Sequence, residues 1–195
     1  MEYRRLGKTD IKLSAIAFGA WAAGGWMWGG TDQKEAMDAI ETAIDRGMTT
    51  IDTAPAYGFG LSEEIVGEVA RMYRKEVQLL TKFGLRWDTT EGEFFFDTEN
   101  NQGSPVKMHK FSGAESVIKE CEASLKRLRT DYIDLLQIHW ADSTTPIEET
   151  YKAVEKLIKD GKVLSAGVCN YSVEQMKEAE KATTIVSNQS SINSA

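Results

Sequence analysis

The sequence predicts an α/β fold, a parallel (β/α)8 barrel of the TIM-barrel type with about six βα units present. Short apolar runs alternate with amphipathic helical stretches, which is typical of a parallel sheet covered by helices. Polar residues fall at or just past the carboxyl ends of five different runs, whereas an open doubly wound sheet concentrates them near one switch point. The common dinucleotide-binding motif G-x-G-x-x-G does not follow the first run. The polar residues are Asp52, Lys82, His139, Asn170 and Gln189.

The elements follow from local patterns along the chain. Residues 2–14 predict a small hairpin that turns near Gly7 and Asp10. Helical periodicity, supported by Gly47 as a C-terminal cap and Pro146 in a first turn, predicts five helices, two of them opened by capping boxes at 112–115 and 172–175. The helices span 32–46, 62–73, 112–129, 146–161 and 172–181. The strands span 15–18, 49–53, 77–82, 132–138, 163–168 and 184–187.

Residues 84–112 break the alternation. They are polar and aromatic and contain Gly92, Gly103 and Pro105, so we expect a long loop. A loop of this length in a compact domain is usually functional and often lines a site. The run Gly24–Gly30, rich in tryptophan, is expected to form a pocket wall rather than a phosphate cradle, and His109 is expected at the surface or in the loop.

Composition narrows the class of protein. The chain has 195 residues, 42% hydrophobic and 27% charged, as in ordinary globular domains. Its net charge of −7 argues against a nucleic-acid partner, and no apolar run approaches the roughly 20 residues of a membrane helix. The polar N-terminus and the pair Cys121 and Cys169 suggest neither secretion nor a disulfide framework. We therefore expect a cytoplasmic protein without a metal site. The sequence leaves open whether the protein forms an oligomer.

Three of these strand-end residues, together with Tyr57, could act in proton transfer. Lys82 ends an apolar strand, so it should be partly buried and need a counter-charge, and Asp52 ends the preceding strand. Tyr57 lies in the next loop, where a lysine cation should lower the pKa of its phenol from about 10. His139 could orient a carbonyl oxygen or relay a proton. Each also has a structural alternative: a buried ion pair, a loop tyrosine, or a core histidine.

Several segments resemble the aldo-keto reductase family. The segment TIDTAPAYG at 50–58 is similar to the family signature, and so are LTKFG at 80–84, DYIDLLQIH at 131–139 and GKVLSAGVCN at 161–170. They occur in the family's order over nearly the whole chain. The opening RRLGKT at 4–9 resembles the hairpin that plugs the bottom of that family's barrel.

The resemblance implies NADPH-dependent reduction of aldehydes or ketones. It makes Tyr57 the proton donor, Lys82 the partner that lowers its pKa, Asp52 the anchor of Lys82, and His139 the group that positions the substrate carbonyl. The cofactor-binding positions that it implies are Trp21, Asp52, Cys169, Asn170 and Gln189, where Cys169 stands in place of the usual serine. Trp21, Trp87 and Trp140 are the implied substrate pocket. The preference for NADPH over NADH rests on the resemblance alone.

Length is the main departure from the family. A (β/α)8 barrel typically needs about 250 residues, so we expect residues 1–195 to be one domain that lacks the last two βα units. In the family these units grip the cofactor's phosphates, and without them the edge strands are unpaired. The sequence could be part of a longer polypeptide, a fragment completed by another chain, or an inactive relative. The alternative function is non-catalytic cofactor binding, as in potassium-channel β subunits.

Overall fold

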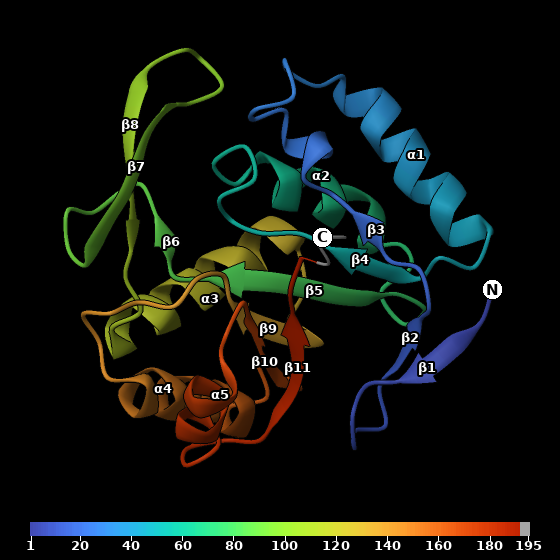
Figure 1. Cartoon of the computed structure of the whole chain (residues 1–195). Helices are drawn as coiled ribbons and strands as arrows, with labels where there is room; N and C mark the ends of the chain where they lie inside the picture. The colour runs from blue at the N-terminus through green and yellow to red at the C-terminus, as the bar shows by residue number, and fades with distance from the viewer. Residues whose placement is uncertain (192–195) are drawn as a thin grey trace.

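The computed structural model describes residues 1–191 and is built around a six-stranded parallel sheet (Figure 1). The strand order is β3-β4-β5-β9-β10-β11, so each strand pairs with the next parallel strand along the chain. This is the order of a (β/α) barrel, and the predicted fold class is confirmed as a partial barrel of six strands. The strands span Phe18–Gly19, Thr50–Asp52, Gln78–Phe83, Leu135–Ile138, Ala166–Cys169 and Ile185–Gln189.

Helices connect the strands and cover the outside of the sheet (Figure 1). Buried apolar side chains from all five helices pack against the strands in one large core. Within residues 1–191, no helix is both long enough and apolar enough to cross a bilayer. The helices are α1 Gln33–Asp45, α2 Leu61–Ala70, α3 Ala114–Leu128, α4 Ile147–Lys159 and α5 Val173–Ala179.

Local capping explains where two of these helices begin. Asp32 caps α1 by accepting a hydrogen bond from the backbone N–H of Glu35 at 3.0 Å, and Ser172 and Gln175 form the predicted capping box of α5. The capping box predicted at Ser112 is wrong. The Ser112 hydroxyl instead donates to Asp142 at 3.1 Å, and α3 begins at Ala114, after a glycine.

The first strand also differs from the prediction. It was expected at 15–18 and buried, but β3 begins at Phe18 and is partly exposed. Ser14 explains the shift, because its hydroxyl accepts the backbone N–H of Thr50 at 3.1 Å and donates to the carbonyl of Ile16 at 2.8 Å. These bonds hold the residues just before β3 in a bend rather than in the sheet.

The N-terminal hairpin closes the amino-terminal end of the sheet. Its strands β1 (Tyr3–Arg5) and β2 (Lys12–Ser14) are antiparallel. Leu6, from its turn, is buried with Leu80 and Leu135 from the sheet interior, and Val186 packs against them. The predicted plug is therefore present.

We expect Leu6→Ala to lower the free energy of unfolding by about 2–3 kcal/mol, since it empties part of this buried cluster. Ile16→Ala is the matched control, because Ile16 is 60% exposed and its truncation should cost less than about 0.5 kcal/mol. Urea unfolding followed by circular dichroism measures both. Equal effects of the two substitutions would contradict the plug.

The predicted loop at 84–112 is wrong, because this segment folds into a three-stranded antiparallel sheet. The strands are β6 (Leu85–Arg86), β7 (Glu93–Glu99) and β8 (Pro105–Lys110), in the order β6-β8-β7. The β7–β8 hairpin stands out from the barrel (Figure 1). His109 lies on β8 and is buried, contrary to the surface position expected.

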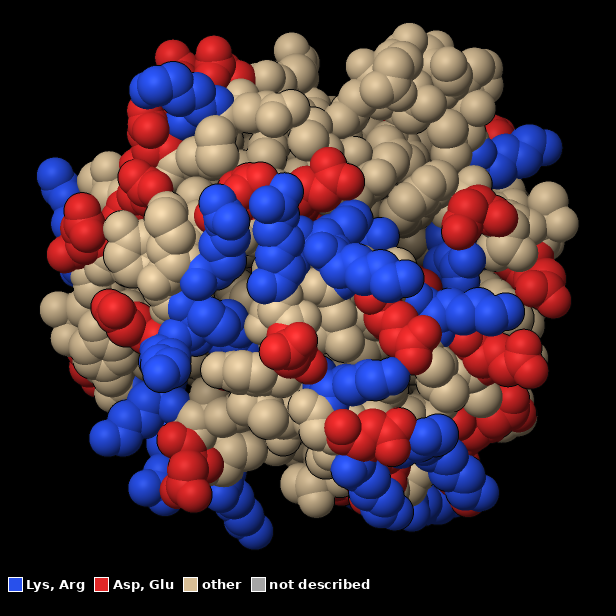
Figure 2. All heavy atoms as spheres, turned by 180° about the vertical axis from the view of Figure 1, so that it is seen from behind, with Lys and Arg blue, Asp and Glu red and all other residues tan. Residues whose placement is uncertain are grey.

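Charges on the helical outer surface are mixed in sign. Figure 2 shows Lys and Arg side chains interspersed with Asp and Glu over the face seen from behind. The helices also carry oppositely charged pairs four residues apart, such as Lys34 with Asp38 and Lys152 with Glu148, both at 2.7 Å. Exposed pairs of this kind add little to stability.

Candidate active site

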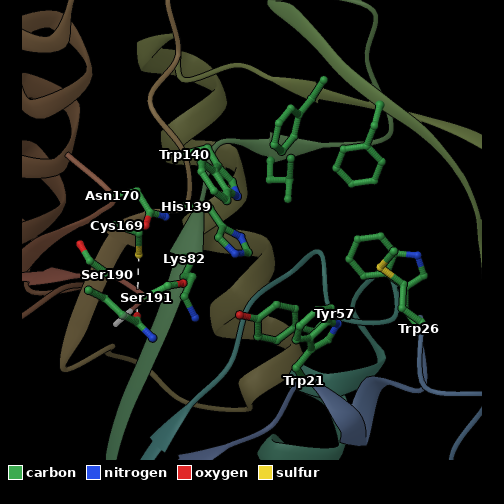
Figure 3. A pocket seen from close by; sticks show the side chains of 15 residues that line it. Trp21, Trp26, Tyr57, Lys82, His139, Trp140, Cys169, Asn170, Ser190 and Ser191 are labelled. Carbon is green, nitrogen blue, oxygen red and sulfur yellow. Dashed lines mark hydrogen bonds between the residues drawn. The ribbon is translucent and has the colours of Figure 1, made fainter. Parts of the chain in front are cut away.

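A hollow of about 550 Å³ opens at the carboxyl ends of the sheet strands. Its lining includes side chains from every strand of the parallel sheet or from the loop that follows it. Figure 3 shows Tyr57, Lys82 and His139 among the side chains around it, together with Trp21 and Trp26 from the β3–α1 loop. Six of the residues predicted for the site at strand ends or in the loop after β4 line it directly, whereas Asp52 lies outside its lining. The six are Tyr57, Lys82, His139, Cys169, Asn170 and Gln189.

Lys82 and Asp52 form a buried ion pair beneath the hollow. Lys82 Nζ donates to Asp52 Oδ2 at 2.9 Å and Oδ1 at 3.0 Å, and to the carbonyl of Thr53 at 2.9 Å. Burial acts to lower the pKa of Lys82, but Asp52 and Tyr57 outweigh it and raise the pKa above its usual value. The ammonium is therefore charged at neutral pH and held in one place.

Tyr57 lies between this ion pair and Trp21. Its ring stacks on Trp21 with centroids 5.8 Å apart, and Lys82 Nζ lies 4.9 Å from its ring centroid. The Tyr57 hydroxyl points toward the Lys82 ammonium (Figure 3). Its loop turns sharply, because Gly58, Phe59 and Gly60 all have positive φ.

The predicted lowering of the Tyr57 pKa is wrong for this structure. Burial, the largest influence, raises the pKa, Lys82 lowers it, and Asp52 raises it again, so the pKa lies above its usual value. The prediction counted the lysine charge but not the burial of the phenol or the nearby carboxylate. Tyr57 therefore holds its proton at neutral pH.

His139 follows β9 and stands edge-on to Tyr57. The ring centroids are 5.6 Å apart at an interplanar angle of 81°, and the backbone N–H of His139 donates to the carbonyl of Phe83 at 2.9 Å. Burial and the charge of Lys82 hold the pKa of His139 well below its usual value. The imidazole is therefore neutral, with one N–H to donate and one nitrogen to accept.

Amide and thiol groups line the side of the hollow formed by β10 and β11. Cys169 Sγ lies 3.7 Å from Gln189 Oε1, and burial raises the pKa of Cys169 to about 12. Gln189 Nε2 donates to Asp52 at 3.4 Å. Asn170 adopts a left-handed backbone with φ of 57° at the start of the loop after β10.

The three predicted tryptophans have different positions. Trp21 and Trp140 line the hollow, and Trp140 packs against Phe95 with centroids 5.4 Å apart. Trp87 does not line it. Its ring instead packs edge-on against Phe59 at 5.5 Å, beside a separate surface hollow.

The sequence prediction missed an aromatic wall contributed by the β7–β8 hairpin. Phe95 and Phe96 line the hollow together with Leu85. Trp26 and Met27 complete this wall from the β3–α1 loop, as expected of the tryptophan-rich run. The three consecutive phenylalanines at 94–96 were the signal that could have identified the hairpin as a wall.

A buried carboxyl group supports the end of β5 from outside the hollow. Glu120 Oε2 accepts the backbone N–H of Gly84 at 2.9 Å, two residues after Lys82. Ser116 donates to Oε1 at 3.0 Å, and Arg86 lies 3.4 Å away. Burial raises the pKa of Glu120 from 4.5 to about 7, against the opposing effect of Arg86.

This raised pKa predicts a pH-dependent stability. The folded chain keeps a proton that the unfolded chain loses, so the contribution is full below about pH 4.5 and disappears as the pH rises through about 7. We expect the free energy of unfolding to fall by on the order of 2–3 kcal/mol across this window, and Glu120→Gln to remove that fall. Urea unfolding at pH 5 and pH 8 measures the difference, and identical pH profiles for both proteins would contradict it.

Comparisons with known proteins agree with this geometry. The chain is 47% identical over 178 residues to Aldo-keto reductase YhdN of Bacillus subtilis, covering 90% of this chain and 49% of that protein. It is 37% identical over 179 residues to the NADH-specific methylglyoxal reductase of Escherichia coli, covering 89% of this chain and 53% of that protein. The glycerol dehydrogenase AKR11B4 from Gluconobacter oxydans matches with a TM-score of 0.84 and 40% identity, over 96% of this chain and 54% of that one.

The chain spans about half the length of the curated relatives it matches. The model of the Aldo/keto reductase family matches residues 15–195, which include every strand of the parallel sheet. Together with the strand order and the polar residues at the strand ends, this match shows that the chain belongs to the aldo/keto reductase family.

Proposed function

We propose that this protein reduces aldehydes or ketones to alcohols by hydride transfer from NADPH, with Tyr57 as the proton donor. The observation that carries the proposal is the convergence of three groups on one hollow. The Tyr57 hydroxyl points toward the charged Lys82, and the neutral His139 ring stands beside it (Figure 3). Proton donation by a positioned side chain is the chemistry that this arrangement supports.

The residues along β10 and β11 suit a nicotinamide carboxamide. Such a group has an amide donor and a carbonyl acceptor, and Asn170 and Gln189 offer both complementary functions at the edge of the hollow. Trp21 provides a flat apolar surface on the opposite side, where it is 39% exposed. When bound there, the reduced nicotinamide would supply a hydride to the carbonyl carbon.

Tyr57 would donate its proton to the carbonyl oxygen as negative charge develops there. Its raised pKa keeps the phenol protonated before the reaction. The Lys82 ammonium would then stabilise the phenolate that remains, because a cation close to an anion in a buried site interacts more strongly than in water. Asp52 would hold Lys82 in position through the two hydrogen bonds described above.

His139 would orient the substrate by donating an N–H hydrogen bond to the carbonyl oxygen. A neutral imidazole suits this role, because it can donate without giving up a proton of its own at neutral pH. The aromatic wall of Trp26, Phe95 and Phe96 would hold the apolar part of a small carbonyl compound. A cytoplasmic location belongs to the same proposal, since both cysteines are free thiols.

The proposal is tested by incubating the protein with an aromatic aldehyde and either NADPH or NADH. We expect loss of the reduced cofactor's absorbance, matched by an equal amount of alcohol, and faster turnover with NADPH. The name of the Escherichia coli relative specifies NADH, so equal or faster turnover with NADH would overturn the cofactor assignment alone. Binding of both cofactors without consumption, over a panel of aldehydes and ketones, would instead favour the non-catalytic alternative.

A further inference from the structure

The loop that carries Tyr57 touches the turn that carries Trp21 through two glycines. A Cβ atom added to Gly24 would stand 2.5 Å from the carbonyl oxygen of Tyr57, and one added to Gly58 would collide with the carbonyl of Gly24. Gly58 also has a φ of 68°, a conformation that glycine adopts readily. The two backbones are therefore in direct contact beside Tyr57.

Asn101, at the tip of the β7–β8 hairpin, bridges these two backbones. Its Nδ2 donates to the carbonyl of Gly24 at 3.0 Å and to that of Gly58 at 3.4 Å. Both partners are carbonyl oxygens, so only the NH₂ side of the amide can serve them. The residues it joins are 77 and 43 positions away in the sequence.

The adjacent asparagine shows what an ordinary hairpin-tip residue does. Asn100 Oδ1 accepts the backbone N–H groups of Gln102 at 2.9 Å and Ser104 at 3.0 Å, so its side chain stabilises its own turn. The Asn101 side chain instead leaves the turn and reaches two loops of the barrel. Its hydrogen bonds are therefore not explained by the needs of the hairpin.

A second set of contacts ties the same hairpin to the β3–α1 loop. Trp26 Nε1 donates to Thr98 Oγ1 at 3.1 Å, and the Trp26 and Phe96 rings stack with centroids 6.3 Å apart at 7°. Phe59, two residues after Tyr57, packs edge-on against Trp26 at 5.6 Å. The hairpin is thus held against the β3–α1 loop. Asn101 adds a contact to Gly58, the residue that follows Tyr57.

We propose that Asn101 is a positioning residue that holds the Tyr57 loop against the Trp21 turn and so sets the Tyr57 hydroxyl opposite Lys82. This inference rests on the proposed function, in which Tyr57 donates the proton. Asn101 itself lies outside the hollow, so it acts through the backbone of Gly58 rather than on a substrate. Its loss changes the geometry of the chemical step more than the binding of cofactor or substrate.

Three variants distinguish the effect of losing the amide donor from the effects of added negative charge and of a changed side-chain length. Asn101→Asp keeps the shape but replaces the donor by a carboxylate oxygen facing two carbonyls. Asn101→Gln keeps the amide on a longer side chain. Gln102→Glu adds the same negative charge one residue away, at an exposed position whose backbone, not its side chain, makes the hydrogen bond to Asn100.

With an aromatic aldehyde and NADPH, we expect Asn101→Asp to lower kcat by about tenfold or more, because small displacements of a catalytic group are costly. Its KM and the Kd for NADPH should stay within about twofold of the wild-type values. Asn101→Gln should recover most of the lost kcat, and Gln102→Glu should match the wild type. An unchanged kcat in Asn101→Asp, or equal losses in all three variants, would overturn the proposal.

Hydrogen–deuterium exchange of residues 54–62 provides a measurement that needs no activity. The Phe59 and Leu61 amides donate within this loop at 3.3 and 3.2 Å, and they should exchange faster in Asn101→Asp but not in Gln102→Glu. If the wild type shows no turnover, the proposed function fails, and the positioning claim is decided by exchange alone. Unchanged exchange in Asn101→Asp overturns it.

Discussion

Tyr57→Phe is expected to lower kcat for aldehyde reduction by about 10²–10⁴-fold, the range of a lost general acid. The substitution removes only the hydroxyl oxygen, so the ring can still stack on Trp21 and contact Lys82. The hollow should therefore keep its shape, and the Kd for NADPH should stay within about twofold. Steady-state kinetics and a fluorescence titration with NADPH measure the two quantities separately.

Tyr132→Phe is the matched control for this experiment. Tyr132 also has a cation over its ring, with Arg74 Cζ 3.7 Å from the centroid, but it lies before β9 and outside the hollow. We expect its kcat to equal that of the wild type. Turnover by Tyr57→Phe at the wild-type rate would refute the proton-donor role, whereas a weakened Kd with a normal kcat would make Tyr57 a binding residue.

Asp52→Ala is expected to lower the free energy of unfolding by about 3–5 kcal/mol, because it leaves the Lys82 ammonium without its counter-charge. The Lys82 side chain is only 2% exposed, so water cannot replace the carboxylate well. The Thr53 carbonyl remains as a single acceptor at 2.9 Å. Urea unfolding of the wild type and the variant at pH 7 measures the loss.

The double variant Asp52→Ala with Lys82→Met tests the cause of that loss. Removing both charges eliminates the unpaired ammonium, so we expect the double variant to be more stable than Asp52→Ala. It should nevertheless have no measurable reductase activity, because Tyr57 would lack the neighbouring cation. A double variant no more stable than the single one would show that the destabilisation comes from lost packing rather than from a buried charge.

The barrel skeleton could be predicted because its signals are local. Asp32 and the Ser172 capping box mark helix starts through bonds made within one turn. Strand ends were displaced by a few residues where distant contacts decide them, as with Ser14 and Thr50, which are 36 positions apart. Such a contact leaves no periodic pattern in the sequence.

The β7–β8 hairpin was missed for a geometric reason. An ordinary strand places successive side chains on opposite faces, and three consecutive phenylalanines do not alternate. The structure resolves the conflict with a register shift between Phe94 and Phe96. Phe95 and Phe96 then both line the hollow, while Phe94 is 51% exposed. A bulge of this kind defeats a search for period-two alternation.

The positions of the candidate site residues were easier to predict than their electrostatics. Asp52, Lys82 and His139 lie at the carboxyl ends of their strands. In a (β/α) barrel these ends all lie on the same side of the sheet, so the side chains come close together. The pKa of Tyr57 depends instead on how deeply the loop buries it, which the spacing of residues does not reveal. Trp87 shows the same limit, since its ring packs against Phe59 beside a separate hollow, a contact that the spacing of residues does not reveal.

The plug at the bottom of the sheet has a consequence for the order of folding. Neighbouring strands of the sheet pair with their successors, so the βα units can assemble in turn as the chain leaves the ribosome. Leu6 packs with Leu80, but two of its other partners, Leu135 and Val186, are synthesised well over a hundred residues after it. The contacts of Leu6 with these two residues can therefore form only after Val186 has been made, so the burial of the hairpin is completed late even though its contacts with Gly47 and Thr50 are available early.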